Sequence, residues 1–215
     1  MGLFPVFLKL KGRRCLVVGA GTIGEAKTRS LLESGAVVHA VGPKATKTLQ
    51  QWAREEKLVW HARPFNPSDL EGMFLVVVAT SSRRLNERVY QEAVRRGILC
   101  NAVDDPGHCD FYYGAVVRCG PLQIAISTSG CSPALAQRLK REIAKQFGPE
   151  YGAWVEQLGE ARRRLLARNM DPKRRKRLLH HLASGENALR DALRFQTFPM
   201  IAQGHSRPAR IIKDG

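Results

Sequence analysis

The run Arg-Cys-Leu-Val-Val-Gly-Ala-Gly-Thr-Ile-Gly, residues 14–24, sets the architecture of the chain. Its apolar part, Cys15 to Val18, is typical of a strand buried on both faces of a parallel sheet. Gly19, Gly21 and Gly24 follow in G-x-G-x-x-G spacing. The first glycine permits a tight turn, the second lets the backbone approach a pyrophosphate, and the third allows the next helix to pack on the strand. The start of that helix would then present free N–H groups to the anion.

The glycine triplet predicts dinucleotide binding, with an ordinary structural turn as the alternative. Its context favours binding, because a strand precedes it, a helical pattern follows it and a second strand is expected over 36–41. One feature departs from the pattern: the segment 41–44, Val-Gly-Pro-Lys, stands where an acidic residue usually holds the adenosine ribose. Either backbone groups around Gly42 and Pro43 hold the ribose, or Lys44 and Lys47 accept a 2′-phosphate. NAD and NADP both stay open.

Strand and helix patterns alternate as far as residue 110, which predicts a doubly wound, Rossmann-like α/β domain with a parallel sheet. Beyond the glycine turn we expect helices over 46–56 and 84–96, and strands over 58–60, 74–79 and 98–102. The apolar segment Phe4 to Leu8 is expected to cap the sheet. Thr80 ends the most strand-like run, at the edge where ligands bind in open α/β sheets.

The pattern changes after Asp104. Two strands, 111–118 and 122–127, form a predicted hairpin, and Ser132 and Pro133 are expected to cap and begin a helix that runs to Phe147. Helices are then predicted over 151–168, 172–183 and 186–195, before a loose basic tail over 197–215. We therefore divide the chain into an α/β domain (1–111), a small α+β dimerisation region (112–148) and a basic helical domain (149–215).

Composition narrows the class of protein. The 215 residues carry a net charge of +16, with +8 in residues 1–150 and another +8 in the much shorter remainder. Such a charge favours a polyanionic partner, either a nucleic acid or a small molecule with many carboxylates. The five cysteines form no C-x-x-C pair, so we expect reduced thiols and no zinc knuckle. No run is long enough to span a membrane, and a cytoplasmic protein is the expectation.

A few polar residues are candidates for chemistry. Asp104 and Asp105 follow a predicted strand at the edge where the dinucleotide would lie, and a carboxylate beside a nicotinamide can take a proton as hydride leaves the substrate. Aspartates also favour turns, which is the structural alternative. His108 could act in the same way but has no visible partner. The loop 127–130 could bind substrate carboxylates or simply precede a capped helix.

Several motifs together resemble the precorrin-2 dehydrogenase family of siroheme biosynthesis, which includes bifunctional dehydrogenase/ferrochelatases and a module of siroheme synthase. The resemblance rests on the N-terminal Phe-Pro-Val-Phe-Leu, the glycine turn, Val-Val-Ala-Thr at 77–80, Asn-Ala-Val-Asp at 101–104, and Thr-Ser-Gly-Cys-Ser-Pro-Ala-Leu-Ala at 128–136. It is strong from residue 3 to about 145 and weaker in the helical tail.

The resemblance implies NAD-dependent oxidation of precorrin-2 to sirohydrochlorin by a homodimer. It implies that Asp104 is the essential carboxylate and that Thr128 stands where some relatives have a serine that can be phosphorylated. The expected cofactor contacts are Gly19, Gly21, Thr22, Ile23, Gly24, Pro43, Lys44 and Thr80. The expected substrate contacts are Asn101, Thr128, Ser129 and Gly130.

Other functions stay open at this point. Relatives in the family also insert Fe²⁺, but no cluster of preorganised metal ligands is visible, so we expect dehydrogenation alone and no metal site. A domain that senses NAD(H) without turnover would carry the same glycine turn. A nucleic-acid-binding protein would use the basic tail, although no aromatic residues alternate with its charges for base stacking. We expect neither a nucleic acid nor a membrane partner.

Overall fold

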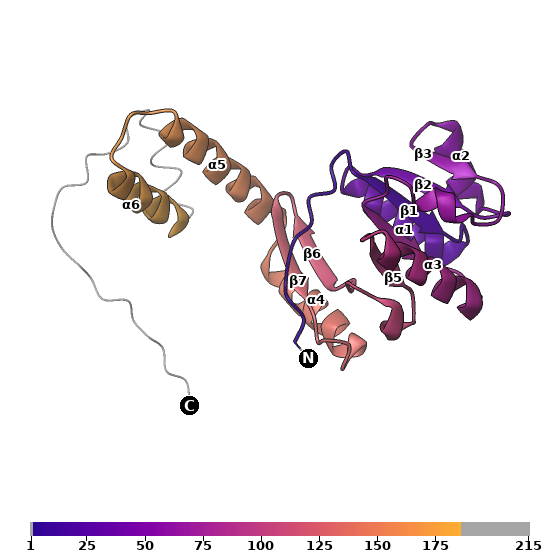
Figure 1. The fold of residues 1–215 in the computed structure, drawn as a ribbon. Coiled ribbons are helices and arrows are strands. Elements are labelled where there is room, and N and C mark those ends of the chain that lie inside the picture. Colours follow the sequence, from indigo (N-terminus) through magenta and orange to yellow (C-terminus); the bar gives the residue numbers. More distant parts are fainter. Residues whose placement is uncertain (1, 186–215) are drawn as a thin grey trace. The chain divides into compact units, whose positions relative to one another are not determined.

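The computed structural model describes residues 2–185 and divides into two compact units, Met1–Tyr113 and Gly114–Gly215 (Figure 1). The predicted helix over 186–195 and the tail over 197–215 lie outside the described residues. The division of the second unit into a region 112–148 and a helical domain 149–215 stays a prediction.

The first unit is built on a five-stranded sheet in which every pair of neighbours is parallel, in the order β3-β2-β1-β4-β5. Its strands are β1 (Arg14–Val18), β2 (Val37–Val41), β3 (Leu58–His61), β4 (Leu75–Val78) and β5 (Leu99–Ala102). Its helices are α1 (Thr22–Glu33), α2 (Lys47–Arg54) and α3 (Arg83–Arg95). The predicted doubly wound α/β fold is confirmed.

The sheet is buried on both faces, which explains the continuous apolar runs of β1 and β4. On one face Leu31 of α1 and Leu49 of α2 pack against side chains of β1, β2 and β4. On the other, Val89 and Ala93 of α3 pack together with Leu70. Leu70 ends the short 3-10 helix η1 (Pro67–Leu70).

Because helices already cover both faces, no apolar face is left for the N-terminal segment. The expectation that Phe4 to Leu8 caps the sheet is wrong: Phe4 is 86% and Phe7 69% exposed. The segment also forms no strand or helix.

The strand order reverses its direction of growth between β1 and β4. From β1 the chain winds outward through β2 to β3, then crosses back to β4 and continues to β5. In open α/β sheets a crevice forms beyond the carboxyl ends of the strands at such a point, and ligands bind there. The loops that follow β1, β4 and β5 all begin at this edge. The topology by itself therefore places a candidate site next to residues 19–24, 79–82 and 103–105.

The second unit begins with an antiparallel hairpin and continues as helices. Its elements are β6 (Ala115–Cys119), β7 (Leu122–Ile126), α4 (Pro133–Gln146), α5 (Pro149–Leu166) and α6 (Pro172–Ala183). As predicted, the Ser132 hydroxyl caps α4 by accepting a hydrogen bond from the Leu135 N–H at 3.2 Å. A small core of Ala161, Leu165, Leu178 and Leu182 joins α5 to α6.

The hairpin starts four residues later than predicted, because residues 109–111 are attached to β5 instead. The N–H of Asp110 donates to the Cys100 carbonyl at 2.8 Å, and the Cys100 N–H donates to the Asp110 carboxylate at 2.9 Å. An isolated bridge also pairs Asn101 with Cys109. This short return segment fixes the loop that carries Asp104 and Asp105.

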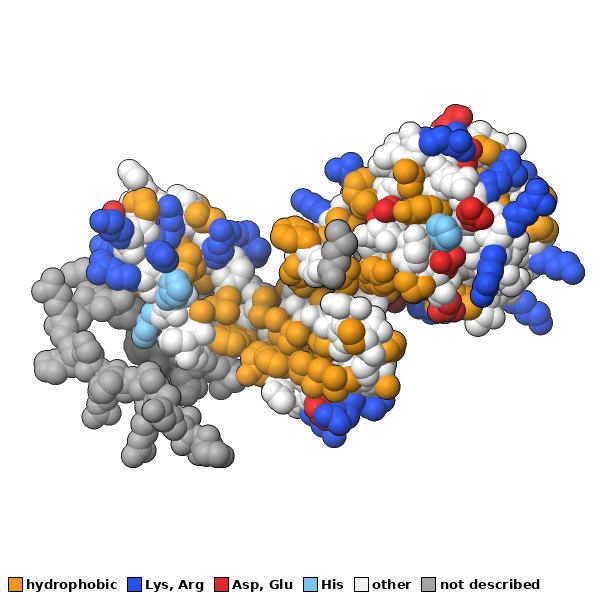
Figure 2. Space-filling model, turned by 60° about the horizontal axis from the view of Figure 1, so that its bottom comes forward, with side chains coloured by type: hydrophobic (Ala, Val, Ile, Leu, Met, Phe, Trp, Pro, Cys, Tyr) orange, Lys and Arg blue, Asp and Glu red, His pale blue; other side chains and the backbone are white. Residues whose placement is uncertain are grey.

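Basic side chains and partly exposed apolar side chains gather on different parts of the surface (Figure 2). Helix α6 contains five Lys and Arg residues and no acidic residue. In the hairpin, the alternate residues Leu122, Ile124 and Ile126 of β7 are only half-buried. Over residues 2–185, no helix combines the length and the apolar character needed to cross a membrane.

Candidate functional site

The glycine turn after β1 can be formed only by glycine at two of its positions. Gly19 has φ +102°, and a Cβ atom there would overlap the carbonyl oxygen of Ala79 at the end of β4. A Cβ atom on Gly24 would overlap the carbonyl oxygen of Gly19. At Gly21, by contrast, a Cβ atom would meet nothing within 4 Å. The first and third glycines therefore serve the packing of strand and helix, whereas the second borders open space.

Helix α1 begins in that open space without a cap. Its N-cap residue is Gly21, and no side chain accepts a hydrogen bond there. The other two α-helices of the unit are capped, α2 by the Thr46 hydroxyl and α3 by the Ser82 hydroxyl. The first-turn N–H groups of a helix need acceptors, and the positive end of the helix dipole favours an anion. A dinucleotide pyrophosphate fits this position by charge and by space.

The loop after β2 lies against the same turn. The N–H of Gly19 donates to the Val41 carbonyl at 2.9 Å, and the Thr46 N–H donates to the Ala20 carbonyl at 3.1 Å. Pro43 and Lys44 lie between these two ties and are exposed. The structure thus brings Pro43 and Lys44 next to the glycine turn, as two parts of one dinucleotide site require.

Gly42, in the same loop, already uses both of its backbone polar groups. Its N–H donates to the His61 carbonyl at 3.1 Å, and its carbonyl accepts a hydrogen bond from the Trp60 indole Nε1 at 3.0 Å. From the sequence, backbone groups around Gly42 and Pro43 are one of the two expected contacts to the ribose. The structure leaves Pro43, Lys44 and Lys47 as the exposed groups at this place. Trp60 was missed by the sequence analysis, because a contact between the end of β3 and the loop after β2 depends on sheet order.

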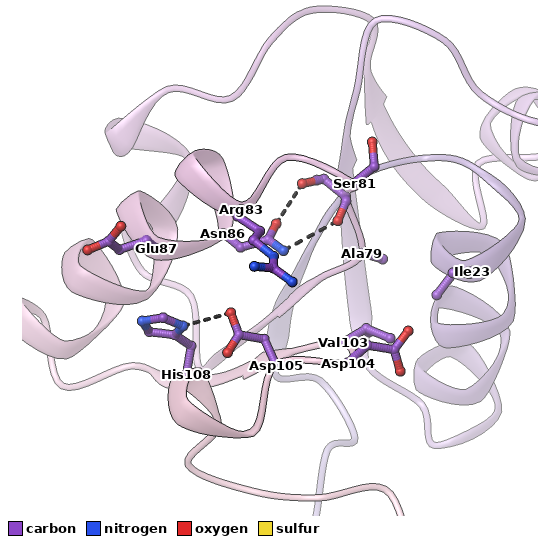
Figure 3. Close-up of a pocket in the computed structure, with 11 residues that line it drawn as sticks. Ile23, Ala79, Ser81, Arg83, Asn86, Glu87, Val103, Asp104, Asp105 and His108 are labelled. Carbon is purple, nitrogen blue, oxygen red and sulfur yellow. Dashed lines mark hydrogen bonds and ion pairs between the residues drawn. The ribbon is translucent and has the colours of Figure 1, made fainter.

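A cavity of about 770 Å³ opens beside the first turn of α1, at the carboxyl edge of β4 and β5 (Figure 3). The loops after β4 and β5, the helices α1 and α3 near their N-termini, and His108 contribute to its wall. It is lined by Ile23, Ala79, Thr80, Ser81, Arg83, Asn86, Glu87, Val103, Asp104, Asp105 and His108. Of the residues expected from the sequence, the cavity brings together Ile23, Thr80 and Asp104.

Asp104 occupies the loop after β5 in an unusual backbone conformation. Its φ of +60° lies in the left-handed region, which aspartate tolerates better than most residues. Its side chain is exposed at the cavity wall, to which Ile23 contributes from the first turn of α1. The conformation turns the chain back toward the return segment 109–111 directly after the candidate carboxylate.

Lys27, one turn after Ile23, is a further charged neighbour of Asp104. Its ammonium lies 3.8 Å from the centre of the Tyr113 ring. Burial lowers the pKa of Lys27, and the charges of Asp104 and Cys109 oppose that lowering. Lys27 therefore supplies a positive charge close to Asp104. The sequence offered no signal for this contact beyond the helical spacing from Ile23.

His108 has the partner that the sequence did not reveal. Its Nδ1 atom lies 2.8 Å from Oδ2 of Asp105, and both residues line the cavity. They are brought together by the short 3-10 helix η2 (Pro106–His108), which places residues three apart on one side. Figure 3 shows this pair on the α3 side of the cavity and Asp104 on the α1 side.

Thr80 is held in place by Asn86, which the sequence analysis also missed. The Thr80 hydroxyl donates to Oδ1 of Asn86 at 2.6 Å, and Nδ2 of Asn86 donates back to the Thr80 carbonyl at 3.3 Å. Asn86 is only 5% exposed. The pair fixes the end of β4 to the first turn of α3, next to the glycine turn.

Asn101 is buried and is not among the residues that line the cavity. Its side-chain amide donates to the Phe111 carbonyl at 2.7 Å. In this structure Asn101 therefore supports the loop that carries Asp104.

The remaining expected substrate residues, Thr128, Ser129 and Gly130, belong to the second unit. They form a turn before α4 in which Ser129 and Gly130 have positive φ values. The Thr128 hydroxyl accepts a hydrogen bond from the Ser132 N–H at 3.1 Å, and the Thr128 carbonyl accepts one from the Cys131 N–H at 2.9 Å. The hydroxyl and the carbonyl of Thr128 are thus engaged in hydrogen bonds that form the turn itself.

All five cysteines are free, as expected. Burial raises the pKa of the Cys15 thiol to about 11 and that of Cys100 to about 12. Among residues 2–185 no group of three or more His, Cys, Asp or Glu side chains is arranged to hold a metal ion.

Comparison with known proteins agrees with this geometry. Residues 6–115 match the family described as putative NAD(P)-binding, and residues 120–146 match the family described as sirohaem biosynthesis protein central. The siroheme synthase of Photorhabdus laumondii subsp. laumondii is 34% identical over 189 residues, which cover 88% of this chain and 40% of the relative. That of Nitrosococcus oceani is 36% identical over 152 residues, which cover 71% of this chain and 32% of the relative.

The chain spans less than half the length of these siroheme synthases. A solved structure, "SirC, precorrin-2 dehydrogenase", matches over 90% of this chain and 98% of its own length, with a TM-score of 0.77 and 27% sequence identity. The family match over residues 6–115 contains the glycine turn and the residues that line the cavity. The chain belongs to the family described as putative NAD(P)-binding, whose model matches residues 6–115.

Proposed function

We propose that this chain is a precorrin-2 dehydrogenase, which oxidises precorrin-2 to sirohydrochlorin with NAD⁺ in siroheme biosynthesis. The observation that carries the proposal is the cavity that Ile23 and Asp104 line together. Ile23 belongs to the uncapped first turn of α1, where a pyrophosphate fits, and Asp104 is a carboxylate on the same wall. A dinucleotide site and a candidate proton acceptor are thereby adjacent at the crevice of a doubly wound sheet.

Different residues would bind the different parts of the dinucleotide and act on the substrate. When bound, NAD⁺ supplies the hydride acceptor for the reaction. The first-turn N–H groups of α1 would bind its pyrophosphate, with Pro43 and Lys44 at the adenosine end and Thr80 near the nicotinamide. Asp104 would accept the proton that the substrate loses as hydride leaves. Lys27 supplies a positive charge near this carboxylate.

The substrate is a macrocycle with many carboxylates, and the cavity is not generally basic. Arg83 contributes a cation to its wall, whereas Glu87, Asp104 and Asp105 contribute acids. We propose that Arg83 binds a peripheral carboxylate, while the acidic groups of the cavity face the pyrrole N–H donors. Thr128, Ser129 and Gly130 stay predicted substrate contacts. The strongly basic surface then acts at long range on the approach of the substrate. Asn101 is assigned to positioning, because its amide is engaged within the fold.

A homodimer and a cytoplasmic location stay predictions. The half-buried face of β7, formed by Leu122, Ile124 and Ile126, supports the first of these, because a two-stranded hairpin needs further cover for such a face. Light scattering of the purified chain measures its mass in solution. Cell fractionation tests the location.

One assay separates the possible functions. The protein is mixed with precorrin-2 and NAD⁺, and sirohydrochlorin absorbance and NADH formation are followed with and without Fe²⁺. The proposal predicts equal amounts of NADH and sirohydrochlorin without iron. Binding of NADH without turnover would indicate a sensor, and loss of sirohydrochlorin on adding Fe²⁺ would indicate a chelatase as well.

A variant pair tests the role of Asp104. Asn also tolerates a positive φ, so Asp104→Asn keeps the backbone but removes the proton acceptor. We expect kcat to fall about 10²- to 10⁴-fold, with NADH affinity unchanged. Glu33→Gln, an exposed acid at the far end of α1, is the matched control. If Asp104→Asn turns over at the wild-type rate, the assignment of Asp104 is wrong.

A further inference from the structure

The pair formed by His108 and Asp105 is a second acid–base group in the cavity, and its hydrogen-bond geometry fixes its chemistry. Nδ1 of His108 lies 2.8 Å from Oδ2 of Asp105. An ionised carboxylate only accepts hydrogen bonds, so Nδ1 must carry the hydrogen. In the neutral ring, Nε2 then holds the lone pair and can accept a proton.

The imidazole is held from several sides. The backbone N–H of His108 donates to the Asp105 carbonyl at 3.0 Å within η2. The Tyr112 hydroxyl donates to the Pro106 carbonyl at 3.3 Å and so ties the same turn. Tyr90 of α3 meets the ring edge to face, with the ring centres 4.9 Å apart. Such supports preorganise a group for proton transfer, since its orientation need not be found at each turnover.

The pair lies between the cavity and solvent. The side chains of His108 and Asp105 are each 31% exposed, and both line the wall that Asp104 also lines. The charged groups facing this wall are Arg83 and Glu87 from α3 and Asp104 from the loop after β5 (Figure 3). A macrocycle bound over the cavity would separate Asp104 from bulk water. His108, at the α3 end of the cavity, would still be in contact with bulk water.

We propose that His108, oriented by Asp105, takes the proton that Asp104 has removed from the substrate and passes it to solvent. This inference rests on the proposed dehydrogenase function. In each turnover one substrate hydrogen leaves with its electron pair as hydride for the dinucleotide, and a second leaves as a proton to Asp104, its bonding electrons staying in the macrocycle. The proton then moves, directly or through water, to Nε2 of His108 and on to water or buffer, which restores both residues.

The kinetic test uses His108→Asn, whose amide can still donate to Asp105 but has no titrating nitrogen. In weak buffer we expect kcat to fall about 10- to 100-fold, at or below the lower end of what a positioned acid or base contributes. Added imidazole should restore the rate, and KM for NAD⁺ should stay unchanged. His180→Asn, an exposed histidine on α6, controls for the loss of an imidazole elsewhere. A wild-type rate in weak buffer, or a loss that imidazole does not restore, would overturn the proposal.

A second measurement needs no activity and no variant that has to fold. Long-range ¹H–¹⁵N spectra of the unaltered chain distinguish the two neutral tautomers of histidine. The proposal requires the Nδ1–H tautomer for His108. An Nε2–H tautomer would contradict the proposal even in an active enzyme. An inactive wild-type chain with the Nδ1–H tautomer would instead count against the dehydrogenase function, and with it the relay.

Discussion

The carbonyl oxygen of Gly19 occupies the space that a side chain on Gly24 would need, so strand β1 and helix α1 meet backbone to backbone. Gly19 is itself constrained by the Ala79 carbonyl and by its φ of +102°. These two glycines are therefore required by packing, independently of any ligand. Gly21, between them, is not.

Alanine at these positions should separate folding from binding. Gly19→Ala combines an overlap with backbone and a left-handed conformation that costs about 1–2 kcal/mol, so we expect a clear loss of stability in urea unfolding. Gly21→Ala should fold like the wild type, with a helix-start cost below about 1 kcal/mol, yet bind NADH more weakly because its methyl group enters the open space. Equal NADH binding by Gly21→Ala and wild type would contradict a pyrophosphate at this place.

The hydrogen-bonded pair of Thr80 and Asn86 at the cavity wall predicts a stability effect that needs no bound ligand. Asn86→Ala removes both hydrogen bonds and leaves the half-buried Thr80 carbonyl without this partner, which should cost about 1–3 kcal/mol in the free energy of unfolding. Gln91→Ala, an exposed residue of α3 that bonds to Glu87, should cost less than about 0.5 kcal/mol. A double-mutant cycle with Thr80→Val measures the coupling. Additive effects of the two substitutions would show that the pair does not act as a unit.

Much of the fold could be predicted because its determinants are local. The apolar runs of β1 and β4, the glycine spacing and the cap at Ser132 are each recognised within a few residues. The N-terminal segment Phe4 to Leu8 misled the prediction because it is as apolar as a core strand. Whether such a segment is buried depends on whether a free face exists, and the covered sheet offers none.

The site was predicted only where it follows from strand ends. Asp104 and Thr80 come directly after strands, so the sheet edge brings them to one place. Asn86 and Trp60 act through contacts across elements, which the sequence does not encode locally. The pairing of Asp105 with His108 is local, but it depends on a 3-10 turn, whose three-residue period differs from that of an α-helix.

The contact of Trp60 with Gly42 predicts an effect on cofactor affinity but not on kcat. Trp60→Phe keeps the ring but removes the indole N–H that donates to the Gly42 carbonyl. Losing one such hydrogen bond costs about 0.5–1.5 kcal/mol, which corresponds to about 2- to 10-fold in affinity if it loosens the loop of Pro43 and Lys44. Titration with NADH measures the change, and kcat should not fall. Trp52→Phe, on α2 beneath Arg29, is the control.

The histidine pair on β2 and β3 predicts how stability depends on pH. His39 and His61 stack with their ring centres 5.8 Å apart. Burial, and then the charges of Arg14 and His61, lower the pKa of His39, although Asp69 opposes this. A base whose pKa is lower in the folded state favours folding above its ordinary pKa of about 6.5, and this contribution is lost as the pH falls. Urea unfolding should therefore show stability decreasing from pH 7.5 to 5.0, and His39→Gln should flatten that decrease. His181→Gln, exposed at the end of α6, should leave it unchanged. An equally steep decrease in His39→Gln would place its origin in other groups.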